Sequence, residues 1–203
     1  MAKGGGFERI VCKRLSLWWT NNKRDDIFWR STQSGGRATT RAKKGVTTAN
    51  SSGDMCYLDA IGKPFIDGMI VELKRGYGGG KKRKTKEVKV LEILDNSTKK
   101  NFLLLEWLKK LEMERIRSER KYSWLIFRRD RMNGCIVLDL TQFIELEKLN
   151  GSWHKRAIIF SARKNYIIIL LLEDFLKWCP PTTMKAIIAG YPVTRKIKRR
   201  KKK

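Results

Sequence analysis

The sequence has few of the residues that build zinc-thiolate and nucleophilic sites: 4 cysteines and 1 histidine among 203 residues. The cysteines lie far apart and form no Cys-x-x-Cys pair, so a zinc finger has no ligand set. So few cysteines also argue against a disulfide framework, and reduced thiols are expected, as in an intracellular protein. The single histidine, His154, leaves no Ser/His/Asp set for nucleophilic catalysis and is interpreted as a surface or packing residue.

Acidic residues and long apolar runs are scarce as well. Only 20 Asp and Glu oppose 46 Lys and Arg, which gives a formal charge of +26. A field of that strength implies a polyanionic partner, with nucleic acid favoured over an anionic membrane surface or a ribosome. No apolar run is long enough to span a bilayer, and the start has no apolar signal segment. We therefore expect no membrane partner and a cytoplasmic location, in the host cytoplasm if a phage encodes the chain.

The length and the hydrophobic content of 41% favour one domain with appendages. Apolar spacing predicts a helix over residues 7–19, after a flexible glycine-rich lead at 1–6. A longer helix is expected over 101–121, and its charged residues, Glu114 among them, would form a solvated face. The other expected elements of this half are a strand at 27–32, basic loops at 33–52 and 76–84, and a short helix at 88–94.

The second half of the chain contains two units of strand, turn, strand and helix. In the first unit Asn133-Gly134 separates two apolar runs, which is a strong hairpin signal. Pro180-Pro181 would stop the last helix, and the tryptophans fall mostly on apolar stripes, which favours core packing over base stacking. The expected elements are a hairpin within 123–140, a helix at 140–149, strands at 157–160 and 166–170, and a helix at 171–178.

Asp54, Glu72 and Lys74 carry the candidate chemistry. Two β-rich runs flank a Gly/Pro turn at residues 62–64 and predict a hairpin in which position 54 opposes position 72. Because side chains alternate along a strand, Glu72 and Lys74 point the same way. Paired carboxylates suit a hard cation such as Mg²⁺, and a nearby lysine suits a phosphate. The same parity excludes two other acids from the site, Asp59 and Asp67.

The order of these elements resembles the PD-(D/E)XK nuclease superfamily, the restriction-endonuclease-like fold. Its Glu-x-Lys element matches residues 72–74, its preceding strand acid matches Asp54, and its first-helix acid matches Glu8. The glycine-rich start, the Phe-Glu-Arg helix and the Arg-Ser strand are similar to archaeal-type Holliday junction resolvases and small phage endonucleases. The resemblance covers roughly the first two-thirds of the chain. Gly53 stands where many members have proline, and the stretch before Asp54 is unusually long.

For the fold, the resemblance implies an α/β domain with a mixed central β-sheet flanked by helices. One nuclease domain would span residues 1–180, with its core at about 7–140 and a β-hairpin/helix extension at 141–180. Residues 181–203 would form a disordered basic tail, since the last nine residues are almost all Lys and Arg.

For the chemistry, the resemblance implies Mg²⁺-dependent hydrolysis of DNA phosphodiesters, with Mn²⁺ as a substitute. Asp54 and Glu72 would ligate the ion, with the Leu73 carbonyl as a third ligand. Lys74 would orient the attacking water or stabilise the phosphorane charge, and Glu8 would bind a second ion or position water. A homodimer is implied by the resemblance alone, because junction resolvases generally need two active sites.

Basic and small residues supply the expected DNA contacts. The segment from Arg30 to Arg37 suits a phosphate cradle of backbone N–H and guanidinium groups, although a plain surface loop is the competing interpretation. The residues expected to bind nucleic acid are Arg30, Ser31, Arg37, Arg41, Lys81, Lys82, Arg83, Lys84, Arg199 and Arg200.

Simpler interpretations of the candidate residues stay open from the sequence alone. Asp54 could start a strand after a turn, where Asp is common, and Glu72 with Lys74 could form a solvent-facing charge pair on an edge strand. Glu8 could simply stabilise its helix, because a negative charge in the first turn interacts favourably with the helix dipole. The alternative function is a non-catalytic nucleic-acid-binding protein, such as a packaging or ribosome-associated factor. Among enzymes, a nicking or site-specific endonuclease is the alternative to a resolvase.

Overall fold

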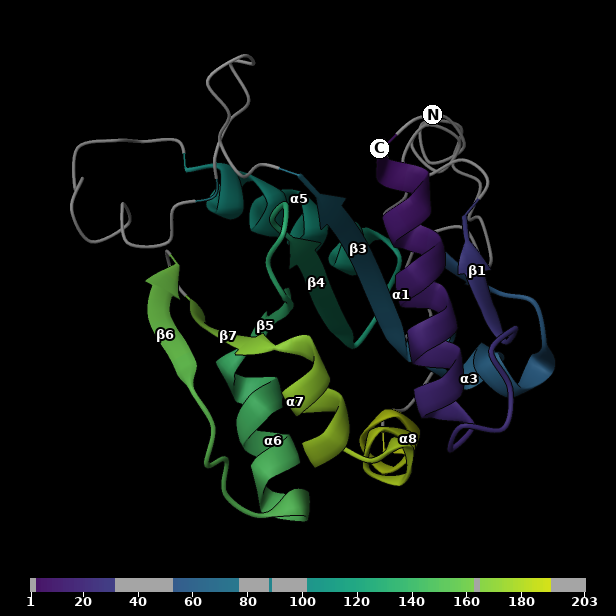
Figure 1. The fold of residues 1–203 in the computed structure, drawn as a ribbon. Helices are drawn as coiled ribbons and strands as arrows, with labels where there is room; N and C mark the ends of the chain where they lie inside the picture. The colour runs from purple at the N-terminus through teal and green to yellow at the C-terminus, as the bar shows by residue number, and fades with distance from the viewer. Residues whose placement is uncertain (1–2, 32–52, 77–87, 89–101, 163–164, 191–203) are drawn as a thin grey trace, which may run out of the picture.

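The structure is a computed structural model that describes residues 3–31, 53–76, 88, 102–162 and 165–190 (Figure 1). Its centre is a five-stranded mixed sheet in the order β3-β4-β5-β7-β6, accompanied by a two-stranded sheet of β1 and β2. The expected α/β fold is therefore confirmed. The strands are β1 Phe28–Arg30, β2 Met55–Tyr57, β3 Met69–Arg75, β4 Tyr122–Arg128, β5 Gly134–Asp139, β6 Ala157–Ala162 and β7 Asn165–Leu171.

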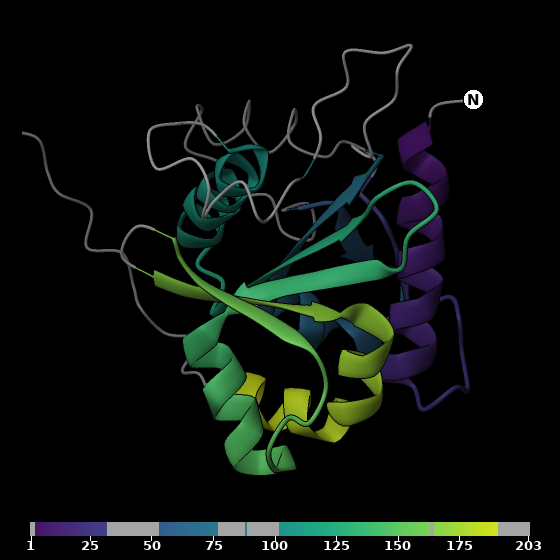
Figure 2. The same cartoon turned by 60° about the vertical axis from the view of Figure 1, so that its left-hand side comes forward.

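Helices cover both faces of the central sheet. Figure 2 shows α1 and α5 on opposite sides of the strands, and α6, α7 and α8 gather below them. α5 connects β3 to β4, which is why these neighbours can run parallel, while the other neighbours in the central sheet are antiparallel. The helices are α1 Lys3–Trp19, α3 Lys63–Gly68, α5 Leu103–Arg117, α6 Leu140–Asn150, α7 Leu172–Trp178 and α8 Pro181–Ala189, with a 3₁₀ turn, η1, at Ala60–Gly62.

The alternation of β3 assigns its side chains to two hydrophobic cores. Met69, Val71 and Leu73 belong to the larger core, which includes the apolar stripe of α1. Ile70 belongs to the smaller core, which includes Trp107 and the apolar face of α5. Successive strand residues point to opposite faces, so Glu72 and Lys74 share the α5 side with Ile70.

A cluster of aromatic rings fills the larger core around Phe65. Its ring centroid lies 5.1 Å from Phe28, 5.3 Å from Trp19 and 5.4 Å from Trp124. Core packing of tryptophan, as predicted, holds for Trp18, Trp19, Trp107 and Trp124, which are buried. The remaining tryptophans, Trp29, Trp153 and Trp178, are half-buried.

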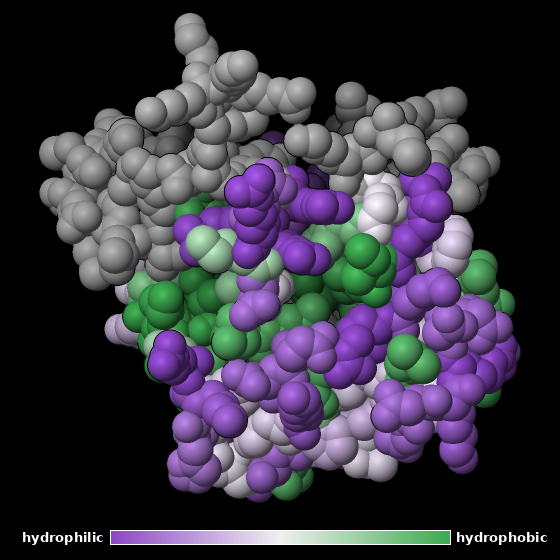
Figure 3. Space-filling view, in the orientation of Figure 1, coloured by the Kyte–Doolittle hydropathy of each residue, from purple (hydrophilic) through white to green (hydrophobic). Residues whose placement is uncertain are grey.

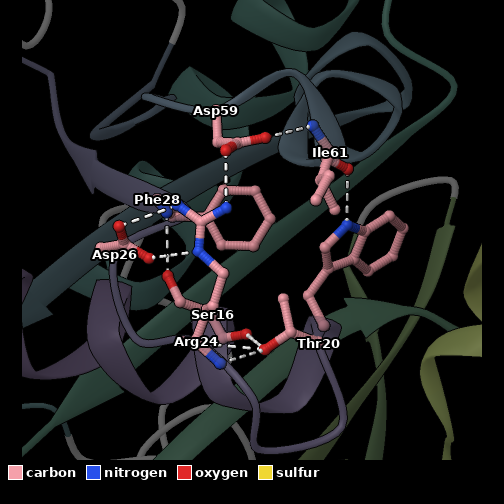
Figure 4. A network of polar contacts seen from close by, with 8 residues as sticks. Ser16, Thr20, Arg24, Asp26, Phe28, Asp59 and Ile61 are labelled. Atoms are coloured by element: carbon pink, nitrogen blue, oxygen red, sulfur yellow. Dashed lines mark hydrogen bonds and ion pairs between the residues drawn. The ribbon is translucent and has the colours of Figure 1, made fainter.

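Polar contacts fasten the end of α1 to β1 and to the segment around η1 (Figure 4). The buried hydroxyl of Ser16 accepts a hydrogen bond from the Phe28 backbone N–H at 2.8 Å. Arg24 pairs with both Asp26 and Asp59 at 2.7–2.8 Å. These bonds fix β1 beside α1, and β1 in turn pairs with the strand that follows the candidate aspartate.

The second half of the chain agrees closely with the sequence prediction. β4 and β5 form the expected antiparallel hairpin, and α6 follows directly. Its turn lies at residues 129–132, where Arg131 has a positive φ and the Met132 N–H donates to the Arg129 carbonyl, so Asn133 follows the turn and Gly134 already pairs with Arg128. The second unit of β6, β7 and α7 also forms, but β7 pairs with β5. The unit therefore extends the same sheet and is not a separate appendage.

The predicted hairpin of residues 53–74 is wrong in its pairing, because its two strands do not pair with each other. β2 pairs with β1, β3 pairs in parallel with β4, and the segment between β2 and β3 is helical. Asp59 starts the 3₁₀ turn by accepting from the Ile61 N–H, and Pro64 lies in the first turn of α3, where its missing N–H costs nothing. Burial of Phe65 and Ile66 then favours a helical turn over an extended strand.

Two predicted boundaries also change. α1 begins at Lys3, so the expected flexible lead is partly helical. Pro181 lies in the first turn of α8, whose Met184 and Ile187 are buried in the larger core, so the domain does not end at residue 180. The expected helix at 88–94 apart from residue 88, the loops at 33–52 and 77–84, and the tail at 195–203 lie outside the described residues.

One face of the molecule is shown in space-filling form in Figure 3, where hydrophilic residues dominate and hydrophobic residues gather at the centre and left. The edge strand β6 contributes exposed Ile158 and Ile159 to the surface. Within the part of the chain that the structure describes, no helix is both long and apolar enough to cross a membrane.

Candidate active site

Gly53 and Asp54 enter the fold beside the middle of β3. Gly53 has φ of +77°, and a Cβ atom there would lie 2.7 Å from the Val71 carbonyl oxygen, so glycine alone fits. The Asp54 N–H donates to that same oxygen at 2.9 Å, and the Asp54 carbonyl accepts from the Ser31 N–H at 2.9 Å. Asp54 is thereby held by backbone bonds on both sides, and it is 5% exposed.

The Asp54 carboxylate is directed along β3. Its Oδ2 accepts a hydrogen bond from the Leu73 N–H at 2.8 Å. Because its backbone contacts Val71 and its side chain contacts Leu73, Asp54 lies opposite Glu72. This is the opposition that the sequence predicted, although it arises from an isolated contact and not from a continuous hairpin.

Glu72 and Lys74 lie on the same side of β3 and form an ion pair with each other. Their side chains are 21% and 25% exposed, so both are largely shielded from water. Burial raises the pKa of Glu72 to about 7, the charge of Asp54 adds to the rise, and Lys74 opposes it. The rise reflects the burial of Glu72 first and the negative charge of Asp54 beside it second.

Glu8 reaches the same region from α1. Burial and then the charge of Asp54 raise its pKa, whereas Arg30 is the first of the cations that oppose the rise. One oxygen of Glu8 lies 4.0 Å from the Arg30 guanidinium. Glu8 is thus an electrostatic neighbour of Asp54 and approaches from the face of the sheet that α1 covers, while its role in binding an ion or positioning water stays a prediction.

Basic side chains surround the first turns of α1. A Cβ atom on Gly5 would lie 2.9 Å from Nη1 of Arg30, and one on Gly6 would lie 3.9 Å from Nη1 of Arg75. The missing side chain of Gly5 therefore allows the Arg30 guanidinium to approach the helix closely, and the Arg75 guanidinium lies in ordinary contact distance of Gly6. Arg30 and Ser31 are the predicted DNA contacts within the described residues; the others, Arg37, Arg41, Lys81, Lys82, Arg83, Lys84, Arg199 and Arg200, lie outside them.

Glu114 belongs to this region although the sequence placed it on the solvated face of its helix. Its Oε1 accepts a hydrogen bond from the Gly53 N–H at 2.9 Å, and its charge contributes to the raised pKa of Glu72. A signal was present: Glu114 follows Leu111 by three positions and therefore continues the buried stripe of α5.

The two acids that parity excluded have other partners. Asp59 accepts from the Ile61 N–H and pairs with Arg24, and these contacts lower its pKa. Asp67 pairs with Lys63 and lies 3.6 Å from Arg120. Each is thus part of a structural ion pair outside the cluster around Asp54.

The donors of the cluster can be compared with those of a divalent metal site. Across the residues that the structure describes, no group of three or more His, Cys, Asp and Glu side chains gathers as a ligand set. Asp54 and Glu72 nevertheless offer two hard carboxylates with crowded charge, and proteins often hold Mg²⁺ by one or two carboxylates plus substrate phosphate and water. The pair therefore fits Mg²⁺, while ligation by Glu8 and by the Leu73 carbonyl stays a prediction.

Comparisons of the chain with protein-family models, with curated proteins and with solved structures found no match. The chemistry of the site therefore rests on its own residues and their contacts.

Proposed function

We propose that the chain is a Mg²⁺-dependent DNA endonuclease that hydrolyses phosphodiester bonds with a PD-(D/E)XK arrangement of Asp54, Glu72 and Lys74. One observation carries the proposal: Asp54 is fixed opposite Glu72 by its contacts with β3, and Lys74 is paired to Glu72 beside it. Largely shielded charges within a strand are costly, and a catalytic task explains why they are kept.

The residues have separate tasks in this proposal. Asp54 and Glu72 hold Mg²⁺, for which Mn²⁺ substitutes, and the Leu73 carbonyl and Glu8 complete the set. Bound there, the ion polarises the scissile phosphate and lowers the pKa of a water ligand. Lys74 orients the attacking water or stabilises the charge that develops on the phosphate oxygens.

DNA is the proposed partner because the formal charge of +26 favours binding to a polyanion and because basic groups lie near the carboxylates. Arg75 directly follows Lys74, and Arg30 lies 4.0 Å from Glu8. A junction or other branched substrate and a homodimer are the finer parts of the proposal, and they rest on the resemblance to Holliday junction resolvases.

Incubation of the purified protein with Mg²⁺ on linear, supercoiled and four-way-junction DNA tests the proposal. Asp54→Asn, Glu72→Gln and Lys74→Ala should each reduce cleavage by roughly 10²-fold or more, because each removes a metal ligand or the group that directs the water. DNA binding should be retained. Asp67→Asn is the matched control, since it also removes one carboxylate from an ion pair, and it should keep most of the activity.

Two results would contradict the proposal. Cleavage that survives in all three site variants would mean that these residues do not catalyse it. Tight, salt-dependent DNA binding by the wild type with no cleavage in Mg²⁺ or Mn²⁺ would favour a non-catalytic nucleic-acid-binding protein instead.

A further inference from the structure

The contact between α5 and the Gly53–Asp54 segment has a consequence for the candidate site. Glu114 lies on α5, 61 positions along the chain from Gly53, yet its Oε1 accepts the Gly53 N–H at 2.9 Å. α5 lies in the connection between β3 and β4, which pair with each other in parallel. The bond therefore ties the Gly53–Asp54 segment to that connection.

The hydrogen bond from the Gly53 N–H to Glu114 adds to three others that hold the neighbouring residue, Asp54. The Asp54 N–H and carboxylate both contact β3, and the Asp54 carbonyl contacts Ser31. All of these bonds act at Asp54 itself. The bond from Glu114 acts one residue earlier, where the backbone is in a left-handed conformation with φ of +77°.

A carboxylate acceptor suits this position. Hydrogen bonds from N–H groups to ionised carboxylates are shorter and stronger than those to neutral acceptors. Gly53 is buried, so its N–H would be costly to leave without a partner. Glu114 is half-buried, and its neighbour Glu112 pairs instead with Arg115, so the two acids of this helix turn have different tasks.

We propose that Glu114 is a positioning residue, which accepts the Gly53 N–H and so keeps the Asp54 carboxylate against β3. Its consequence for metal binding rests on the proposed function. Glu114 itself need not touch the metal or the substrate, since it acts through the backbone of Gly53.

Three variants separate the hydrogen bond from the charge and from the helix. Glu114→Ala removes the acceptor and the charge, Glu114→Gln keeps an acceptor without the charge, and Glu112→Ala removes a neighbouring acid that binds Arg115. The first measurement is amide hydrogen exchange at Gly53 and Leu73 in metal-free protein. The second is calorimetric titration with Mg²⁺ alone, and thermal unfolding confirms that each variant is folded.

The Ala variant should speed exchange at Gly53 by about tenfold or more and weaken Mg²⁺ binding by a similar factor, since one hydrogen bond is lost. The Gln variant should restore both values to within about threefold of wild type. Glu112→Ala should change neither. Unchanged Gly53 exchange in Glu114→Ala, or a Gln variant as impaired as the Ala variant, would overturn the positioning role.

The exchange measurement needs neither metal nor DNA, so the two proposals fail in different ways. Faster exchange at Gly53 and Leu73 in Glu114→Ala, together with a wild type that binds no Mg²⁺, would support the positioning role and contradict the endonuclease. If the wild type binds Mg²⁺ and cleaves DNA while exchange in Glu114→Ala is unchanged, the endonuclease is supported and the positioning role of Glu114 is contradicted.

Discussion

Substitution of Gly53 by alanine should destabilise the protein and displace Asp54. Its φ of +77° costs a non-glycine residue about 1–2 kcal/mol. The new Cβ would also lie 2.7 Å from the Val71 carbonyl oxygen and 2.9 Å from Cγ1 of Ile70, and overpacking of this kind costs about 1–3 kcal/mol. Reduced freedom of the unfolded chain offsets up to about 1 kcal/mol, so the net loss should be about 1–5 kcal/mol.

Chemical denaturation of the full chain, with the midpoint and slope fitted together, measures this loss. In thermal unfolding the same loss should lower Tm by roughly 2–20 °C for a chain of this size. Gly151→Ala is the control, because Gly151 also has positive φ, +83°, but nothing lies within 4 Å of its Cβ position. The Gly53 variant should therefore be the less stable of the two by about 1–3 kcal/mol. Equal losses in both variants would refute the close approach to Val71.

Three further outcomes are expected. The free energy of unfolding should fall as pH rises from about 4.5 to about 7, by at most about 1.4 kcal/mol per pH unit. The reason is that the raised pKa of Glu72 makes the folded state bind the proton more tightly than the unfolded state does. Urea titrations at several pH values measure this slope, and Glu72→Gln should flatten it. Phe65→Ala should lower the free energy of unfolding by about 3–5 kcal/mol, because it removes a fully buried ring from among four aromatic neighbours. Denaturant unfolding measures this loss, and a loss under about 1 kcal/mol would contradict the packing. Deletion of residues 195–203 should flatten the log–log salt dependence of DNA binding by about 0.9 for each phosphate contact removed, and an unchanged slope would mean that the tail does not touch DNA.

Local patterns predicted the elements that local forces decide. Two apolar runs separated by a short polar loop predicted the β4–β5 hairpin, although its turn comes before Asn133-Gly134. Apolar spacing likewise predicted α5 and α6, because both kinds of pattern are visible within a short window. The segment between β2 and β3 was mispredicted because its apolar residues, Phe65 among them, fill a core made by distant elements. Only that core decides between a strand and a helical turn there.

In the candidate site, too, local features were predicted from the sequence and features that depend on distant contacts were not. The Glu72–Lys74 pair followed from strand alternation, which needs no tertiary information. The structure places Asp54 beside Glu72 through its bonds to Val71 and Leu73, and not through the predicted hairpin, which does not form. Glu114 was missed because a charged residue at the end of an apolar stripe looks solvated until the segment that contacts it is known.

The packing of α1 against the last helices has a consequence for synthesis on the ribosome. The Trp18 indole N–H donates to the Cys179 carbonyl at 2.8 Å, across 161 positions of sequence. At about 5–20 residues per second, the first helix waits roughly 8–32 s for its partner to be made. During that time α1 can already pack against β1 and β3, which are complete by residue 75, but Trp18 has no acceptor at residue 179. The end of α1 that carries Trp18 should therefore be the last part of this helix to reach its native contacts, after α7 has been made.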